Sequence, residues 1–219
     1  MIKLDDIKNN PVIDSFIKKG NEYLGVLGYT EHSYRHINLV STIAYNILKE
    51  LECPERTAEL ASIAGYLHDI GNVLNRNEHG ISGAALCFNI LMNMEMHPDE
   101  IATVISAIAN HEEEYGQPVN DVAAALIMAD KSDVHRSRVR NPDFATFDIH
   151  DRANYAVEYA FLRISLETRT ITMDLTIDNS ICSIMEYFEI FLSRMMLCRK
   201  AATFLKCNFE LITNGSKLL

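Results

Sequence analysis

The sequence predicts a mainly α-helical protein with a small α+β extension at its C-terminal end. From about residue 11 to residue 141, apolar residues recur at helical spacing between capping residues and prolines. After Asn141-Pro142 the pattern changes to apolar and polar residues in alternation, which is typical of strands. We therefore expect three parts: an N-terminal helical segment (1–30), a helical metal-binding domain (31–142) and a C-terminal extension (143–219).

Composition limits the class of protein. The 219 residues are 48% hydrophobic, which is enough for one sizeable core. The formal net charge of −10 disfavours duplex nucleic acid and anionic membranes as partners. No apolar run approaches the ~18 residues of a membrane span, and the N-terminus lacks a signal core. Five widely spaced cysteines without a C-x-x-C pair indicate buried, reduced thiols, so we expect a cytoplasmic protein.

The first two expected helices precede the first candidate site residues. One begins at Pro11 with Asn10 as its N-cap and ends at Gly28. We expect its inward apolar face to consist of Val12, Phe16, Tyr23 and Leu27. The next should run from Thr30 to about Leu51, with an inward stripe of Val40, Ile43, Ile47 and Leu51.

Two histidines lie at the start of that second helix. His36 extends the stripe by one turn, so its side chain should point inward. A lone inward histidine is commonly a hydrogen-bonded core residue. His32 lies one turn earlier, where it either supports a ligand or bound water or is a partly exposed helix residue.

The third expected helix begins after Pro54 and ends in a His-Asp pair. Its apolar positions Leu60, Ile63, Ala64 and Leu67 lead into His68-Asp69, and Gly71 closes the run. Burying two ionisable side chains there costs several kcal/mol unless a partner compensates them. A metal ion is a suitable partner, since imidazole and carboxylate ligands bind Zn, Fe or Mn and a carboxylate can bridge two ions.

Three further helices bring more candidate ligands. The first starts at His79 and should bury Ala84, Ala85, Phe88, Leu91 and Met92. The second starts at Pro98, and His111 continues its inner face. Glu112-Glu113-Glu114 then read as a solvated charge run, although Glu112 is close enough to support His111. The third is capped by Asn120 and points Asp130 inward.

The densest basic cluster follows Asp130. It consists of Lys131, Arg136, Arg138 and Arg140. It is either a solvated helix face or a phosphate clamp beside a metal site, because arginine forks match phosphate oxygens. Its position next to Asp130 favours the clamp.

The C-terminal extension predicts a hairpin, a long helix and a short strand. Leu162, Ile164 and Leu166 alternate with polar residues, as do Ile171, Met173, Leu175 and Ile177 after a polar turn. A helix from about Ser180 to Lys206 and a strand over 209–212 follow. We interpret the second His-Asp pair, His150-Asp151, as loop residues or the start of the hairpin rather than metal ligands.

The candidate ligands occur in the order His36, His68-Asp69, His79, His111, Asp130. This order resembles the HD-domain superfamily of metal-dependent phosphohydrolases, whose signature is a His, a His-Asp pair and a distal Asp on an all-α bundle. The resemblance spans roughly residues 31–141, and His36 fits its spacing better than His32 does. His79 and His111 fill the two extra positions of the dinuclear branch.

The resemblance implies a dinuclear hydrolytic site. His36, His68, Asp69 and Asp130 would hold one divalent transition metal (Fe, Mn or Zn), and Asp69 would bridge to a second held by His79 and His111. A hydroxide activated by the two ions would attack phosphorus in line, which makes Asp69 catalytic. The substrate would be a phosphomonoester, phosphodiester or nucleotide, contacted by Lys131 and next by Arg136 or Arg138.

The sequence departs from the HD-GYP subgroup, which cleaves cyclic di-GMP. Asn72 replaces a lysine, Asn110-His111-Glu112 replaces a His-His-Glu run, and Gly116-Gln117-Pro118 replaces Gly-Tyr-Pro. These differences argue against a third metal ion and against a cyclic dinucleotide substrate.

Two other functions fit the same residues. Some HD-fold proteins with this ligand order are di-iron oxygenases, and oxygen consumption would separate them from hydrolases. A non-catalytic module that binds metal or nucleotide is the other, although a structural site needs neither two ions nor open positions. Residues 143–219 lie outside the resemblance and either cover the bundle or form a homodimer interface.

Overall fold

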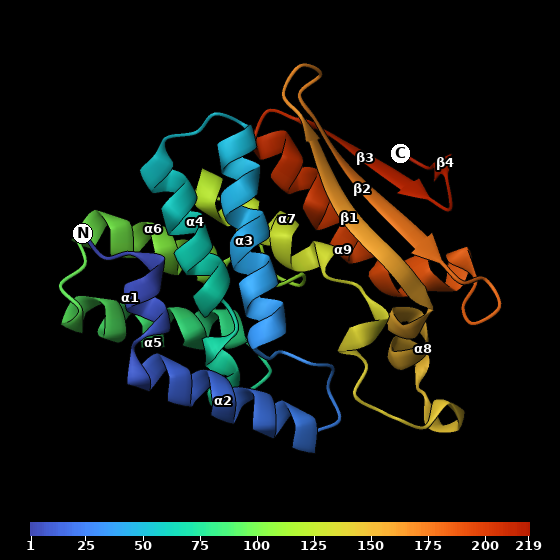
Figure 1. Cartoon of the computed structure of the whole chain (residues 1–219), viewed down its shortest axis with the longest axis horizontal. Coiled ribbons are helices and arrows are strands. Elements are labelled where there is room, and N and C mark those ends of the chain that lie inside the picture. Colours follow the sequence, from blue (N-terminus) through green and yellow to red (C-terminus); the bar gives the residue numbers. More distant parts are fainter.

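Nine α-helices and one four-stranded sheet form the chain, and a computed structural model describes all of residues 1–219. Helices α1 to α7 fill one side of the molecule, and the sheet with α8 and α9 fills the other (Figure 1). This arrangement confirms the predicted fold class, a mainly helical protein with a small α+β extension.

The helices and strands have the following bounds. The α-helices are α1 (Leu4–Lys8), α2 (Pro11–Val26), α3 (Tyr34–Glu50), α4 (Glu55–Leu67), α5 (His79–Asn93), α6 (Pro98–Ala109), α7 (Asp121–Ser132), α8 (Ile149–Ala156) and α9 (Ile184–Phe204). Short 3₁₀ helices are η1 (Ile70–Val73), η2 (Arg136–Arg138) and η3 (Phe144–Thr146). The strands are β1 (Val157–Ser165), β2 (Thr170–Ile177), β3 (Asn208–Thr213) and β4 (Ser216–Lys217). None of the helices combines the length and apolar character that a membrane span requires.

The predicted starts of α2 and α7 are confirmed, and each has a capping side chain. The side-chain oxygen of Asn10 accepts hydrogen bonds from the first turn of α2, and Asn120 does the same for α7. Helix α3 begins at Tyr34 rather than at Thr30, because Ser33 is its N-cap. The segment before Ser33 is instead tied to a distant loop: the Glu31 N–H donates to the Arg138 carbonyl at 2.8 Å.

Two predicted apolar faces are only partly correct. Helix α2 buries Ile13, Ile17 and Leu24, whereas Val12, Tyr23 and Leu27 are exposed. Both sets recur at helical spacing, so periodicity alone does not choose between them. Helix α5 buries small residues: Gly83, Ala84 and Cys87 face inward with Leu91, and Ala85, Phe88 and Met92 are exposed.

Small residues let the elements around the site approach closely. A Cβ on Gly65 of α4 would lie 2.8 Å from the Ser41 Cα of α3, so the two helices can cross only because Gly65 has no side chain. A Cβ on Gly71 of η1 would lie 2.6 Å from the Gly83 nitrogen of α5. The absence of two side chains therefore brings α3, η1 and α5 against the end of α4.

The extension forms a mixed sheet against α9. The strand order is β1-β2-β3-β4, and β1 pairs antiparallel with β2 as the predicted hairpin. Strand β3 runs parallel to β2, with α9 as the crossover between them. Helix α9 contacts α7 on one side and β2 and β3 on the other, so the extension shares one continuous core with the helical domain (Figure 1).

The pair His150-Asp151 lies in α8 rather than in a loop. Asp148 caps this helix by accepting a hydrogen bond from the Asp151 N–H at 2.7 Å. The His150 side chain is exposed. All five cysteines are unpaired; four are buried and Cys53 is half-buried.

Candidate metal centre

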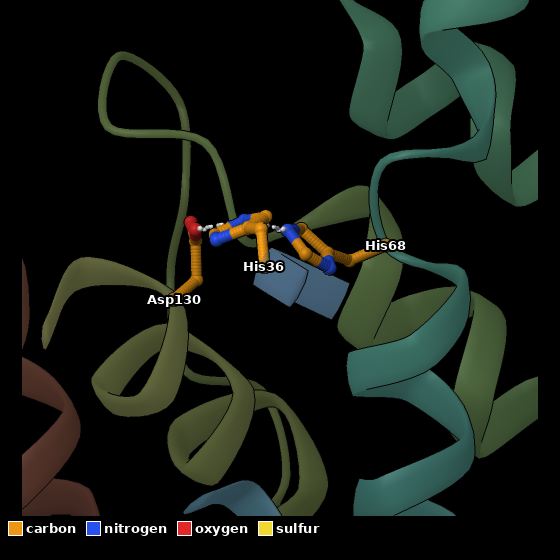
Figure 2. Close-up of side chains that lie close together, drawn as sticks. All are labelled: His36, His68 and Asp130. Atoms are coloured by element: carbon orange, nitrogen blue, oxygen red, sulfur yellow. Dashed lines mark hydrogen bonds and ion pairs between the residues drawn. The ribbon is translucent and has the colours of Figure 1, made fainter. Parts of the chain in front are cut away.

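Three helices bring a first set of ligand atoms together. His36 lies in the first turn of α3, His68 follows the last residue of α4, and Asp130 lies in the last turn of α7 (Figure 2). The His36 Nε2 atom is 3.2 Å from His68 Nε2 and 3.4 Å from Asp130 Oδ1. Asp69 Oδ2 completes the set at 3.4 Å from His36 Nε2 and 3.2 Å from His68 Nε2. We call these four donors the first ligand group.

A second set shares the other oxygen of Asp69. His79 Nε2 lies 3.3 Å from Asp69 Oδ1 and 3.1 Å from His111 Nε2. We call these three donors the second ligand group. The ligand atoms of His68, Asp69 and His111 also lie within 4.8 Å of one another, which connects the two groups. The six residues expected to bind metal therefore converge on one point, with Asp69 between the two groups.

The other ring nitrogen of every one of these histidines faces an oxygen. His68 Nδ1 donates to the Gly65 carbonyl at 2.8 Å, and His111 Nδ1 donates to the Ile108 carbonyl at 2.6 Å. For the remaining two, His36 Nδ1 donates to Asp133 Oδ2 at 2.7 Å and His79 Nδ1 to the Arg76 carbonyl at 3.0 Å. These acceptors place the proton on Nδ1 and leave the Nε2 lone pair for a metal, as is usual for ligating histidines.

The donors fit a bound cation. In each ligand group two Nε2 atoms face each other, those of His36 and His68 at 3.2 Å and those of His79 and His111 at 3.1 Å, so a proton or a metal ion must lie between the members of each pair. Asp69 Oδ2 is buried and has no hydrogen-bond partner, which is costly for an ionised carboxylate. A metal ion in each ligand group would satisfy all of these atoms.

The charges favour the same conclusion. Burial opposes the charged imidazole of His68, but the carboxylates of Asp69 and Asp130 raise its pKa to about 10. Burial also favours the neutral forms of Asp69 and Asp130, yet the neighbouring cations hold both pKa values well below the usual range. Both carboxylates are therefore ionised at neutral pH, and their surroundings attract positive charge.

A fully polar cavity opens beside the ligands. Its volume is about 280 Å³, and none of its 14 lining residues is hydrophobic. Asp69, His79, His111 and Asp130 reach its wall, whereas His36 and His68 do not. Four basic side chains line it: Arg76, Lys131, Arg138 and Arg194.

The predicted basic cluster divides between this cavity and the surface. Lys131 lines the cavity, and its Nζ lies 2.7 Å from Asp130 Oδ2. Arg138 also lines it, but its guanidinium is already hydrogen-bonded within the protein, because it donates to the Glu31 and Asp133 carbonyls and to His32. Arg136 lies outside the cavity and pairs with Glu158 at 3.1 Å, so its expected phosphate contact is not supported. Arg140 bonds Asn21 instead.

The triple glutamate is not a solvated charge run. Glu112 Oε1 accepts from the Gly80 N–H at 2.6 Å, and its Oε2 lies 3.2 Å from His79 Nδ1. Glu113 pairs with Arg194 at 2.8 Å, and only Glu114 is exposed. Glu112 therefore supports His79 rather than its sequence neighbour His111.

His32 is buried, contrary to the reading of it as a partly exposed helix residue. It precedes α3, and its Nε2 lies 4.0 Å from Asp69 Oδ2. Its Nδ1 donates to the Thr30 carbonyl at 2.8 Å and its Nε2 accepts from Arg138 at 3.2 Å. Burial lowers the pKa of His32 well below its ordinary value. Both ring nitrogens are therefore satisfied within the protein.

Two of the four basic cavity residues were not predicted from the sequence. Arg76 precedes His79 by three residues, and its Nη1 lies 3.3 Å from His79 Nε2. That proximity in sequence was a usable signal. Arg194 belongs to α9, and no local pattern links it to the site. Only the packing of α9 on α7 brings it there.

Two comparisons relate the chain to known proteins. Residues 29–137 match the family model of the HD domain, a range that contains all six candidate ligands. The chain is also similar to an uncharacterized protein of Methanocaldococcus jannaschii, with 28% identity over 177 residues. That alignment covers 70% of this chain and 68% of the relative.

Proposed function

We propose that this chain, which belongs to the HD-domain superfamily, is a phosphohydrolase that uses two divalent metal ions to cleave a small phosphate ester. One observation carries the proposal: the two carboxylate oxygens of Asp69 face two different sets of imidazole nitrogens. A structural metal site needs one closed set of ligands, whereas a shared carboxylate with two sets is typical of a two-metal reaction centre.

The side chains of this chain would have distinct roles. His36, His68, Asp130 and Asp69 would hold one ion, and His79, His111 and Asp69 the other. Bound ions of this kind lower the pKa of a water and polarise phosphoryl oxygens. Asp133 and Glu112 would keep His36 and His79 oriented through their Nδ1 atoms. Lys131 would place a positive charge at the cavity wall, where charge develops on the phosphoryl group.

The cavity favours a small, highly charged substrate. A volume of about 280 Å³ with no hydrophobic lining offers a nucleobase no apolar surface to pack against. Among the substrates expected from the sequence, a phosphorylated sugar, polyol or similar metabolite therefore fits the cavity better than a nucleotide.

The test is a phosphate-release panel on protein loaded with Mn, Fe or Zn, beside the metal content of each sample. We expect metal-dependent release from phosphomonoesters that lack a base, with nucleotides turned over more slowly. Oxygen uptake by reduced, iron-loaded protein without phosphate release would instead identify an oxygenase. Failure to bind any metal after reconstitution would leave a binding module and end the hydrolase proposal.

A further inference from the structure

Helix α9 of the extension contributes a side chain to the cavity, although it lies outside the residues that match the HD domain. Helix α9 packs along α7, and Arg194 at the middle of α9 reaches the wall that Lys131 of α7 also lines. The Arg194 guanidinium carbon lies 4.4 Å from the centre of the Phe191 ring, and the side chain is 16% exposed. Arg194 is therefore fixed in position while keeping access to the cavity.

The guanidinium is anchored on one edge only. Its Nε donates to Glu113 Oε1 at 2.8 Å, and its two terminal nitrogens donate to no protein group and are not buried. Arg138 is the opposite case, because all three of its nitrogens bond to protein acceptors. Of these two arginines at the cavity wall, only Arg194 has a free pair of donors.

Glu113 lies close to a second cation, Lys131, in addition to Arg194. Its Oε1 lies 3.8 Å from Lys131 Nζ, and Lys131 in turn contacts Asp130 of the first ligand group. Ser193 Oγ donates to the other oxygen of Glu113 at 3.3 Å. One carboxylate thus positions two cations on the cavity wall next to the metal ligands.

We propose that Arg194 binds an anionic oxygen group of the substrate, with Glu113 as the residue that positions it, so that the extension completes the substrate site. A terminal nitrogen pair matches two oxygens of a phosphate, and such charge-assisted bonds are strong. The proposal rests on the cavity being the substrate site of the proposed hydrolase. It explains why the extension packs on α7 at this point.

Binding of inorganic phosphate, and separately of pyrophosphate, to the manganese-loaded full chain tests the proposal by calorimetry. We expect R194M to weaken binding by about 10- to 100-fold, the range for a lost hydrogen bond to a charged group. The metal content of R194M should equal that of the wild type, because Arg194 touches no ligand. R199M is the matched control: Arg199 lies on the same helix, is exposed, and lies outside the cavity.

A purely structural Arg194 would behave differently. If R194M lowers the melting temperature but binds phosphate as tightly as wild type and R199M, Arg194 only ties α9 to Glu113 and the proposal is wrong. If R194M does not fold, R194K decides, since lysine keeps the charge but not the fork; phosphate affinity equal to wild type would then overturn the proposal. Phosphate binding that depends on Arg194 without any ester hydrolysis would keep this inference while ending the hydrolase proposal.

Discussion

The two ligand groups differ in their surroundings, although they share Asp69. The first ligand group lies between α3, α4 and α7, and its two histidines are completely buried and away from the cavity. The second ligand group forms part of the cavity wall, which both His79 and His111 line although their side chains are almost completely buried. The first group also offers four donors and the second three. The first group therefore meets the cavity only through its carboxylates, Asp69 and Asp130, whereas the second also meets it through both of its histidines.

The largest effect should come from the residue that the groups share. D69A removes one donor from each group, so we expect both ions to be lost and turnover to fall by more than about 100-fold, beyond the effect of losing a supporting residue. Mass-spectrometric metal analysis of purified protein measures this directly, and circular dichroism checks that the helices remain. Two ions per chain in D69A would show that the groups bind metal independently of Asp69.

Substitutions of single histidines test whether the two ligand groups bind their metal ions independently. H79A leaves the second ligand group with only His111 and Asp69 Oδ1, so we expect one ion per chain to remain, held by the intact first group. H36A should instead lower the affinity of the first group, which keeps three donors. Metal content during stepwise dialysis against a chelator distinguishes the two variants. Loss of both ions in H79A would contradict independent binding by the first group.

Asp133 and Glu112 contact the Nδ1 atoms of His36 and His79, and substituting them should have a smaller effect on metal affinity. D133N removes the charged partner of His36, and E112Q removes that of His79. Each should weaken the metal affinity of its own group by about 10- to 100-fold. Asp133 also pairs with Arg35 at 2.9 Å, so D133N should lower the melting temperature more than E112Q does. Equal weakening of both ions by either variant would mean that the groups are not separable.

The convergence of the six candidate ligands was predictable from the sequence, and most of the cavity wall beside them was not. Each ligand lies at the end of an apolar helical stripe or beside a helix terminus, so periodicity and order were enough to find it. The inward face of α5 was predicted only in part, as Ala84 and Leu91, because Gly83 and Cys87 are small; the close approach of Gly71 requires a small residue at Gly83, and Phe88 is exposed.

Long-range packing accounts for what the sequence could not predict. Arg194 reaches the cavity only because α9 crosses from β2 to β3 and packs on α7. Arg136 and Arg138 are two residues apart in one basic cluster, yet Arg136 is drawn to Glu158 at the start of β1. A run of charges thus does not indicate which members face a cavity, since their acceptors come from other parts of the chain.

Substituting His32 should have the smallest effect on metal content and turnover. It tests whether the first ligand group has four donors or five. Its Nε2 lies 4.0 Å from Asp69 Oδ2, only slightly farther than that of His79 from Oδ1. His79 Nε2 faces His111 Nε2 at 3.1 Å, whereas His32 Nε2 faces no other histidine nitrogen and accepts a hydrogen bond from Arg138. We therefore expect H32A to keep two ions per chain and to lower turnover by less than 10-fold, within the range for a supporting residue. H79A, which should lose one ion, is the matched comparison. If H32A also loses an ion, His32 is a fifth donor of the first group.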